Sequence, residues 1–419
     1  MRALVVILFF CSLVCQYAQA QVNSITGVVR DSLSHESLPY VNVFFANTSI
    51  GTSTNSEGEF SISGFPPGKY DLVISFVGYK TQQYSFDFSG SAFKLDVALA
   101  QSLVQLSEIL VKADTMHWKQ NFLTFKENFI GTTANAAKVA ISNSKDIHLY
   151  FDAKDKVLVA HARKDLVIEN KALGYQVYYQ LVDFTLDYRN NRMQYLGIPR
   201  FEQMKATHNL QAKKWETERR RAYEGSFVHL IQTIYQQKLE SSKFQLFELH
   251  EVMNPKRPPQ KFLDEKIKLW RDANFQSTNN SKEKTVVRIS GNGVVSGSGL
   301  GDSLAYYLNL RSLPEKIDSI GREIKSASDL LKPGTSNIIQ FKGRLKVLYK
   351  EREEALYAMG QRRPPQRFQE SVVHFTDDEL KIYPNGYYED VRSLFMQGYL
   401  GWSEKIAEML PTDYKYEVK

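Results

Sequence analysis

The chain has 419 residues, and its 53 Lys and Arg exceed its 46 Asp and Glu, which gives a formal charge of +7 at pH 7. This length is enough for two or three domains. The basic excess is small and spread along the chain, so we expect at most weak attraction to anionic polymers or lipids and no nucleic-acid partner.

Residues 1–20 have the pattern of an export signal. Arg2 supplies a positive end, Leu4 to Phe10 an apolar run, and Ala18-Gln19-Ala20 the small residues before a cut at Gln21. The whole apolar stretch, Ala3 to Val14, is shorter than the roughly 20 residues that a membrane-spanning helix needs. We therefore expect a protein exported to the periplasm or the outer-membrane surface, with no transmembrane segment in the mature chain.

Both cysteines, Cys11 and Cys15, lie inside this predicted signal. The mature chain would then have no disulfide, no thiol nucleophile and no cysteine metal site. A lipid anchor on Cys15 is the alternative. It is disfavoured because Leu13-Val14 precede Cys15, where that kind of processing expects small residues.

From Ile25 to about Leu99, short runs of β-branched and aromatic residues alternate with polar ones and are interrupted at regular intervals by Asn, Ser, Pro and Gly. This pattern predicts an all-β sandwich. Gly58 lies where a hairpin must reverse, so we expect a positive φ there, and Pro66-Pro67-Gly68 predicts a turn between strands.

Five short motifs make this stretch identifiable. They are Gly27, Val29 and Asp31; Leu38, Pro39, Val41, Asn42 and Val43; Gly51, Thr52, Thr54, Asn55, Gly58 and Phe60; Pro66, Gly68 and Tyr70; and Val77, Gly78 and Tyr79. With these motifs, residues 22 to about 111 resemble the carboxypeptidase-like regulatory domain, which implies a small prealbumin-like β-sandwich common in envelope proteins of diderm bacteria. The sequence departs from the family pattern at Asn55, where Asp is usual, and at Ser34-His35, where Thr-Gly is usual. These departures put in doubt any ion held by the loops.

We expect residues 21–99 to form this sandwich, residues 100–118 a connector, and residues 119–419 an α+β domain of unknown function. Within the connector, Leu103, Leu106, Ile109 and Leu110 form an apolar stripe, and residues 109–113 could make a last strand. The expected fold class is mainly β with an α+β second part. In that part a larger strand-rich domain carries a packed amphipathic helix.

The region from 119 to about 205 returns to apolar–polar alternation. Strands are expected at Ile147–Phe151, Val157–Ala162, Leu166–Glu169, Tyr175–Tyr188 and Arg192–Leu196, joined as a meander of hairpins. The apolar side chains Tyr175, Val177, Tyr179, Leu181 and Phe184 are expected to be core and sheet face. An aromatic ligand platform is the alternative.

From about Leu210 to Glu240 the apolar residues recur at three- and four-residue spacing, which predicts a helix that packs on the sheet. Arg219-Arg220-Arg221, with Lys213 and Lys214, form a basic run near its beginning. We interpret this run as a solvated helix face, and a site for phosphates or anionic glycans is the alternative.

The last third is expected to be mostly strands after a loop at residues 254–259. The expected strands are Thr285–Ser290, Leu304–Leu310, Ile338–Phe341 and Leu345–Tyr349, followed by a hairpin of residues 380–383 with 387–388 and a helix at Trp402–Leu410. Three segments are similar in sequence to uncharacterised proteins of the same family and length: Phe129–Thr132, Tyr195–Met204 and Gly398–Tyr414. This resemblance implies no activity.

A search for catalytic chemistry is mainly negative. No histidine has Glu three residues on, and there is no His-Glu-x-x-His, so neither common zinc peptidase centre is expected. His374 and Asp377 have metal-ligand spacing but are isolated. The run from Gly291 to Gly301 lacks the Gly-Lys-Ser/Thr of a phosphate loop and the G-x-S-x-G of a nucleophile elbow, so a surface loop is expected.

The acidic clusters at Asp377-Asp378-Glu379 and at Glu351 to Glu354 are interpreted as solvated turns and helix faces rather than paired catalytic carboxylates. We therefore predict no catalytic, metal or cofactor-binding residues and no cofactor. The predicted function is that of a non-catalytic exported cell-envelope protein that binds or scaffolds an envelope protein or a glycan. The alternatives are an envelope hydrolase of peptide or glycan, and an accessory protein of a TonB-dependent outer-membrane transporter. A pocket with two or more facing carboxylates would favour the hydrolase.

Overall fold

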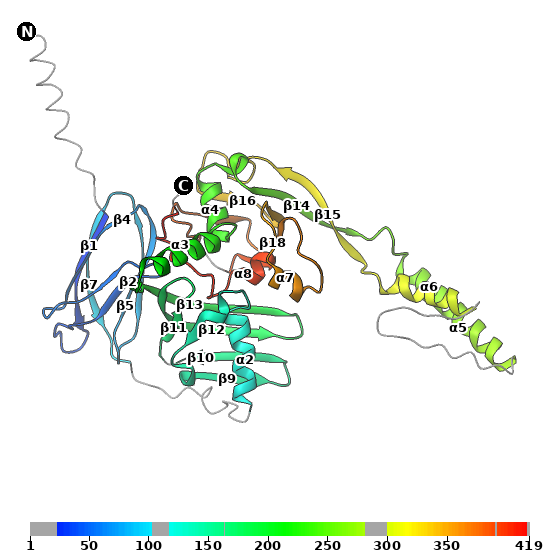
Figure 1. The fold of residues 1–419 in the computed structure, drawn as a ribbon, viewed down its shortest axis with the longest axis horizontal. Helices are drawn as coiled ribbons and strands as arrows, with labels where there is room; N and C mark the ends of the chain where they lie inside the picture. The colour runs from blue at the N-terminus through cyan, green and yellow to red at the C-terminus, as the bar shows by residue number, and fades with distance from the viewer. Residues whose placement is uncertain (1–22, 103–116, 163, 281–299, 390–391, 417–419) are drawn as a thin grey trace, which may run out of the picture. The chain divides into compact units, whose positions relative to one another are not determined.

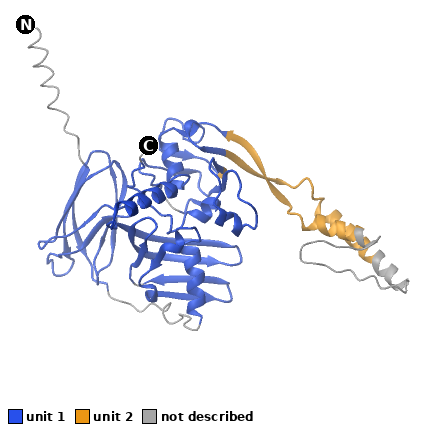
Figure 2. Cartoon of the chain, viewed as in Figure 1, with its two compact units in different colours: residues 1–246, 324–342, 347–419 blue, residues 247–323, 343–346 orange. Residues whose placement is uncertain are grey.

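A computed structural model of the chain describes residues 23–102, 117–162, 164–280, 300–389 and 392–416. The chain divides into two compact units (Figure 2). Unit 1 comprises residues 1–246, 324–342 and 347–419, and unit 2 comprises residues 247–323 and 343–346. The predicted export signal, the apolar stripe of the connector and the predicted strand at 285–290 lie outside the described residues.

The first part of unit 1 is a β-sandwich of two sheets (Figure 1). One sheet has the order β4-β1-β7 and the other the order β3-β2-β5-β6; β1 pairs with β7 in parallel and with β4 in antiparallel fashion. The strands are β1 (Asn23–Asp31), β2 (Asn42–Phe45), β3 (Gly51–Ser53), β4 (Glu59–Phe65), β5 (Gly68–Ser75), β6 (Gln82–Phe88) and β7 (Ala92–Leu99).

Alternating apolar side chains of these strands meet between the two sheets. Phe45, Phe65 and Phe88 are buried there, with ring centroids 4.8 Å apart for Phe45–Phe65 and 4.7 Å apart for Phe65–Phe88. Gly58 has φ +75°, and a Cβ on it would lie 2.6 Å from the carbonyl oxygen of Val29, so both the turn and the close approach require glycine. The predicted mainly β fold, with a sandwich first, is confirmed.

A six-stranded antiparallel sheet follows in the chain. Its order is β8-β11-β12-β10-β9, and β13 also pairs with β12. The strands are β8 (Val139–Ile141), β9 (Ile147–Asp152), β10 (Val157–Ala162), β11 (Leu166–Asn170), β12 (Tyr175–Asp187) and β13 (Arg192–Gln203). The hairpins β9–β10, β11–β12 and β12–β13 confirm that part of the prediction, but the sheet is not a simple meander, because β10 pairs with β12 and not with its successor β11.

The prediction that this region is β from its start is wrong, because it opens with helix α2 (Trp118–Phe129). Phe125 and Phe129 of this helix are fully buried, and the Phe125 ring lies 4.7 Å from that of Phe184 on β12. The helix thus covers the apolar face of the sheet. It was missed because its buried positions are phenylalanines, a residue that is enriched in strands.

The predicted helix at 210–240 is two helices, α3 (Asn209–Tyr223) and α4 (Phe227–Tyr235). Unit 1 also contains β16 (Ile338–Gln340), which pairs with β19 (Glu379–Lys381), and β18 (Gln369–Phe375), which pairs with β20 (Leu394–Gly398). Two short helices, α7 (Ala355–Gly360) and α8 (Tyr399–Ser403), and four single turns of 3₁₀ helix complete it, at Ala136–Lys138, Ser144–Asp146, Leu239–Ser241 and Ala327–Asp329.

The predicted helix at Trp402–Leu410 is wrong beyond Ser403. At Glu404 the chain leaves the helix, with φ −74° and ψ 63°. The amide nitrogens of Ile406 and Ala407 then donate to the carbonyl oxygens of Phe129 (3.2 Å) and Ile130 (3.0 Å) at the end of α2. Tertiary hydrogen bonds with another element therefore replace the helical ones.

The described residues of unit 2 include two paired strands and two packed helices. These are β14 (Phe244–Met253), which begins in unit 1, β15 (Lys316–Ile324), which ends there, α5 (Gln260–Asn280) and α6 (Leu300–Ser312). Strand β17 (Gly343–Tyr349) also begins in unit 2 and ends in unit 1. Leu263, Ile267 and Ala305 are buried side chains of the two helices. Among the helices of the described ranges, none is both long enough and apolar enough to cross a membrane.

The predicted strand at Leu304–Leu310 is wrong, because these residues belong to α6. Leu304, Tyr307 and Leu308 have the three- and four-residue spacing of a helix face, and the two adjacent tyrosines obscured that period.

Candidate functional site

The described residues of unit 1 line a partly open cavity of about 210 Å³. It is bounded by the end of α3 and the turn after it, the end of β17 and the loop that follows, the start of β18, and α8 with the turn beyond it. Its lining residues are Arg221, Ala222, Glu224, Gly225, Ser226, Tyr349, Glu351, Arg352, Glu354, Gln369, Tyr399, Ser403, Glu404 and Glu408.

One wall of the cavity exists because the predicted long helix breaks at Glu224-Gly225-Ser226. Gly225 has φ +82°, and a Cβ on it would lie 2.7 Å from the Tyr349 ring, so only glycine fits this turn. The hydroxyl of Ser226 then caps α4 by accepting from the backbone nitrogen of His229 (3.1 Å).

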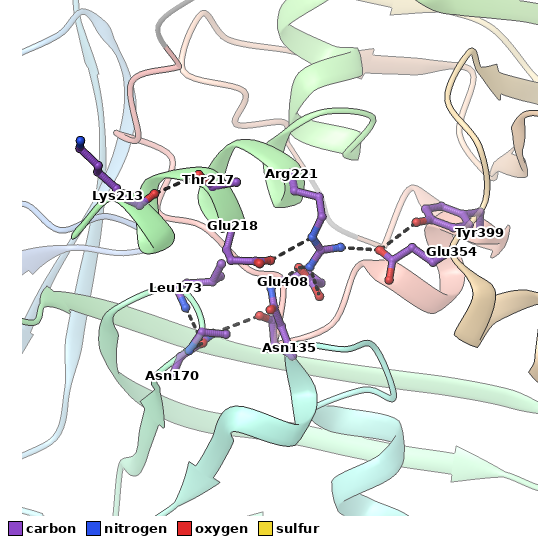
Figure 3. A network of polar contacts seen from close by, with 12 residues as sticks. Asn135, Asn170, Leu173, Lys213, Thr217, Glu218, Arg221, Glu354, Tyr399 and Glu408 are labelled. Atoms are coloured by element: carbon purple, nitrogen blue, oxygen red, sulfur yellow. Dashed lines mark hydrogen bonds and ion pairs between the residues drawn. The ribbon is translucent and has the colours of Figure 1, made fainter. Parts of the chain in front are cut away.

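Arg221 is the centre of a polar network beside the cavity (Figure 3). Its Nε donates to Glu218 Oε2 (3.0 Å), one Nη donates to Glu354, and the other donates to Glu408 Oε2 (3.2 Å). Tyr399 Oη donates to the same Glu354 oxygen (3.2 Å). One guanidinium thus joins α3, the loop after β17 and the segment after α8.

The carboxylates of the C-terminal segment are held by backbone and amide groups as well. Glu408 Oε2 accepts from Asn135 Nδ2 (3.0 Å), and its side chain is only 7% exposed. Glu404 Oε1 accepts from the backbone nitrogen of Phe227 (2.8 Å) at the first turn of α4. Burial raises the pKa of both carboxyls, although hydrogen bonds and nearby cations oppose the rise.

The solvated-face interpretation of the Arg219–Arg221 run is wrong for two of its three arginines. Arg219 is buried; its Nε donates to the carbonyl oxygen of Leu173 (2.7 Å) and its guanidinium lies 4.2 Å from the Tyr175 ring centroid. Arg221 is tied to three carboxylates. Lys213 and Lys214, earlier on the same helix, are exposed.

The interpretation of Glu351–Glu354 as a solvated cluster is also wrong in part. Glu353 is buried and accepts a bidentate pair from Arg363, with Nη1–Oε2 2.5 Å and Nη2–Oε1 2.8 Å. Glu354 pairs with Arg221, whereas Glu351 is exposed. A single sequence shows none of these partners, because they come from other elements.

His374 and Asp377 make separate contacts. His374 on β18 stacks on Phe395 with a centroid distance of 4.1 Å, and its Nε2 lies 3.1 Å from Gln397 Oε1. Asp377 accepts from the hydroxyl of Ser393. Within the described ranges, no three His, Cys, Asp or Glu side chains are grouped as metal ligands.

The aromatic-platform alternative on β12 is wrong for the residues named, which all lie in the core: Tyr175, Val177, Tyr179, Leu181 and Phe184. The Tyr179 ring lies 5.1 Å from that of Phe129 on α2. The sequence did not single out Glu404, Glu408 or Tyr399. Two glutamates four residues apart in a short, mainly apolar segment were the available signal.

The sandwich carries its own polar centre at Asp31. Its Oδ1 accepts from the backbone nitrogens of Leu33 (2.7 Å) and Ser34 (3.0 Å), and its Oδ2 accepts from Tyr79 Oη (2.8 Å) and Gln101 Nε2 (3.0 Å). These four hydrogen bonds hold the pKa of Asp31 well below its usual range. The hydrogen bonds from the backbone nitrogens of Ser34 and Leu33 have the largest effect. The Asp therefore joins three loops at one end of the sandwich.

Comparison with known proteins assigns this part of the chain. The CarboxypepD_reg-like domain family matches residues 25–111. Residues 25–111 are a CarboxypepD_reg-like domain. Over this region the chain is 28% identical across 106 residues to TonB-dependent receptor P3 and 32% identical across 111 residues to TonB-dependent receptor P39, both of Formosa agariphila. Each match covers about a quarter of this chain (25% and 26%) and 10% of the receptor, so the chain spans about a tenth of the length of these relatives.

Solved structures similar to the chain include the C-terminal domain of shaft pilin spaA from Lactobacillus rhamnosus GG and a cohesin–X-dockerin complex from Acetivibrio cellulolyticus. The first is 16% identical, with a TM-score of 0.16, 19% of this chain covered and 98% of that chain. The second is 16% identical, with a TM-score of 0.18, 28% of this chain covered and 81% of that chain.

The CarboxypepD_reg-like domain packs on the rest of unit 1 through the outer face of β2 and β5. Phe44 and Val73, which point away from the sandwich core, are buried against Ile198 of β13. Beside them, Phe201 donates through its backbone nitrogen to the carbonyl oxygen of Thr48 (3.0 Å). Strand β5 is consequently buried on both faces, which explains its continuous apolar run.

A second contact between the CarboxypepD_reg-like domain and the rest of unit 1 lies at the hairpin after β19. Lys69 Nζ lies 2.6 Å from Glu389 Oε1, Tyr387 Oη donates to Asp71 Oδ2 (2.9 Å), and Asn385 Nδ2 donates to the carbonyl oxygen of Lys69 (3.0 Å). Packing and polar pairing therefore both hold the domain in place.

Proposed function

We propose that this chain is a non-catalytic binding or scaffolding protein of the cell envelope. The observation that carries the proposal is that three of the five carboxylates lining the cavity form ion pairs. Glu354 and Glu408 are paired with Arg221, and Glu351 is paired with Lys243. A glycosidase or peptidase of the usual kind needs one carboxyl to donate a proton while a second accepts one or attacks, and an ion pair with Arg opposes the first role.

The size of the cavity supports the same proposal. Sites that enclose a drug-sized molecule occupy about 300–1,000 Å³. The cavity here, at about 210 Å³, is smaller, so it suits one side chain or end group of a partner better than a whole substrate.

The location in the envelope is part of the proposal. Its supports are the predicted export signal and the similarity of residues 25–111 to TonB-dependent receptors. We propose an envelope protein or a glycan as the partner, with accessory service to a TonB-dependent outer-membrane transporter as one form of that role. We propose the same division of the chain into parts: residues 21–99 form the sandwich, residues 100–118 a connector and residues 119–419 the second domain.

The test is a cross-linking pull-down of the full chain from detergent-solubilised envelope. We expect one envelope protein or glycan to be enriched over a heat-denatured control, and then to bind the chain again as purified components. Enrichment of nothing, in the same extract where a known envelope complex is recovered, would contradict the proposal.

A hydrolase is the second candidate, and Glu404 is the specific observation that favours it. Among the described residues, no Lys or Arg forms an ion pair with this carboxyl, and its pKa is raised by burial, as in a general acid. Glycan and peptide substrates incubated with the chain would then be cleaved, and Glu404→Gln would abolish the cleavage. The binding proposal expects no cleavage by either protein.

A further inference from the structure

The charge of the cavity lining is unbalanced. Five carboxylates line it, from Glu224, Glu351, Glu354, Glu404 and Glu408, against the two guanidiniums of Arg221 and Arg352. Arg221 is already paired with three carboxylates, including Glu218 outside the lining, which offset its charge. The cavity therefore attracts positive charge.

Glu224 and Glu404 are the lining carboxylates outside the ion pairs. Tyr416 Oη donates to Glu224, and the backbone nitrogen of Phe227 donates to Glu404 Oε1 (2.8 Å). In the described part of the chain, neither is within ion-pair distance of a Lys or Arg side chain. An ionised carboxylate accepts up to about four hydrogen bonds, so Glu404 retains acceptor capacity for a donor in the cavity.

The volume and the aromatic lining narrow the choice of ligand independently of charge. A cavity of about 150 Å³ holds a molecule the size of benzene, so about 210 Å³ holds a planar end group with a short apolar stem. The rings of Tyr349 and Tyr399 line the same cavity, and tyrosine faces attract cations, above all flat guanidinium groups.

We propose that this cavity binds the guanidinium group of an arginine side chain presented by a protein partner, with Glu404 as its carboxylate acceptor. The proposal rests on the binding function above and names the chemistry that the partner presents. A guanidinium donates two parallel hydrogen bonds to a carboxylate, which a neutral amide of the same shape does not match in strength.

Because Glu404 must be ionised to bind a cation, the affinity of the cavity should depend on pH. Burial raises the pKa of this carboxyl. The titratable groups that interact with it are Glu408, Tyr195, Tyr388 and Lys405, whose pKa burial lowers to about 8; Arg221 and Glu354 line the same cavity. A guanidinium binds the ionised carboxylate, so it must displace any proton there. Affinity therefore rises with pH through the pKa of Glu404, and binding releases protons.

The experiment is calorimetric titration of the full chain with ethylguanidinium and with ethylurea, its neutral isostere. For ligands with so few atoms we expect Kd values of about 1 mM, so the titration is run at high ligand concentration. We expect ethylguanidinium to bind at least about tenfold more tightly than ethylurea, with proton release that grows as the pH is lowered toward the pKa of Glu404. Equal affinity for the two compounds would overturn the proposal without any variant.

Glu404→Gln removes the charge and keeps the shape, and the exposed Glu36→Gln is the matched control. We expect the first to weaken ethylguanidinium binding by about tenfold or more and the second to leave it unchanged. Ethylammonium tests the alternative cation; tighter binding of ethylammonium would overturn the guanidinium assignment.

The same variants separate this inference from the binding function. A partner that is captured equally well by Glu404→Gln and by the natural chain would refute the cavity assignment and leave the binding function standing. Ethylguanidinium binding without any captured partner would refute the binding function instead.

Discussion

Glu353 and Arg363 show how a charged residue inside an acidic run becomes part of the core. The Glu353 side chain is fully buried, and the Arg363 side chain is 30% exposed. Besides the bidentate pair, Glu353 accepts from the backbone nitrogen of Gln366 (2.9 Å). Burial acts to raise the pKa of Glu353, but the hydrogen bonds from Arg363 and Gln366 outweigh it and lower the pKa.

Replacement of Arg363 by Met should strand this carboxylate in the interior. Removal of one partner of a buried pair typically costs about 3–5 kcal/mol, and partial exposure of Arg363 places the expected loss near about 3 kcal/mol. Urea unfolding measures it. Lys350→Met, which removes an exposed charge, is the control and should change stability by less than about 0.5 kcal/mol. Equal losses in the two variants would contradict the structural role of the pair.

His229 is a neutral imidazole packed among aromatic rings. Its Nδ1 accepts from the backbone nitrogen of Gly225 (3.1 Å), and its ring centroid lies 4.7 Å from that of Tyr223 and 5.0 Å from that of Phe244. Burial lowers the pKa of His229 to about 4.

Stability should therefore fall as the pH drops from about 6.5 to about 4, because the unfolded chain then binds a proton that the folded chain excludes. The loss from this residue is about 2 kcal/mol once partial exposure is allowed for. The raised pKa values of Glu404 and Glu408 act in the opposite direction above their ordinary pKa.

His229→Asn, which keeps an acceptor near Gly225, isolates the histidine. The difference in unfolding free energy between the natural chain and this variant should shrink by about 2 kcal/mol between pH 7 and pH 4. A difference that stays constant over this range would show that His229 is not buried as a neutral group.

Among the secondary-structure elements, helix α2 is stabilised mainly by packing on the six-stranded sheet and not by its local sequence. Its buried side chains are aromatic, and the first turn carries no acidic residue and no side-chain cap. Local preference for helix is therefore weak. Burial of Phe125 and Phe129 against the six-stranded sheet supplies the stabilisation instead.

Phe125→Ala should cost about 3–5 kcal/mol, because it removes a fully buried ring and its edge contact with Phe184. Leu123→Ala on the same helix is the control. Leu123 is 47% exposed, so its loss should be below about 1 kcal/mol. Thermal unfolding of both variants measures the difference, and a cost below about 1 kcal/mol for Phe125→Ala would contradict the packing described.

Two helix boundaries, between α3 and α4 and at the end of α8, could not be predicted from the local sequence. The break between α3 and α4 depends on Gly225 lying against Tyr349, and the end of α8 depends on Ile406 and Ala407 bonding to the end of α2. Both causes come from residues distant in the chain. Periodicity reports only whether a face is apolar, so it located the helical regions around 210–240 and Trp402 but missed their ends.

For unit 1 as a whole, the main feature is that the CarboxypepD_reg-like domain is packed on its neighbours rather than only tethered to them. The buried outer face of β2 and β5 joins the domain to β13, and Lys69 and Asp71 join it to the hairpin after β19. We therefore expect the domain and the rest of unit 1 to unfold together in one transition.

Val73→Asp should uncouple them, since it buries a charge at the contact with Ile198 and leaves the sandwich core intact. Calorimetry should then resolve two unfolding transitions in place of one. Gln83→Asp on the exposed side of β6 is the control and should keep one transition. Two transitions in the natural chain would contradict the coupling.

The sequence by itself determined the elements whose signal is local. Alternation of apolar residues placed the strands of the sandwich and of the six-stranded sheet, and the Gly58 turn followed from a backbone that only glycine adopts easily. Tertiary structure decided the cavity and its charges. Arg221 meets Glu354 and Glu408, which are 133 and 187 residues away, and an isolated sequence carries no record of such distances. A carboxylate in a charged run looks the same whether it faces water or an arginine, because pairing and burial are properties of the folded neighbourhood.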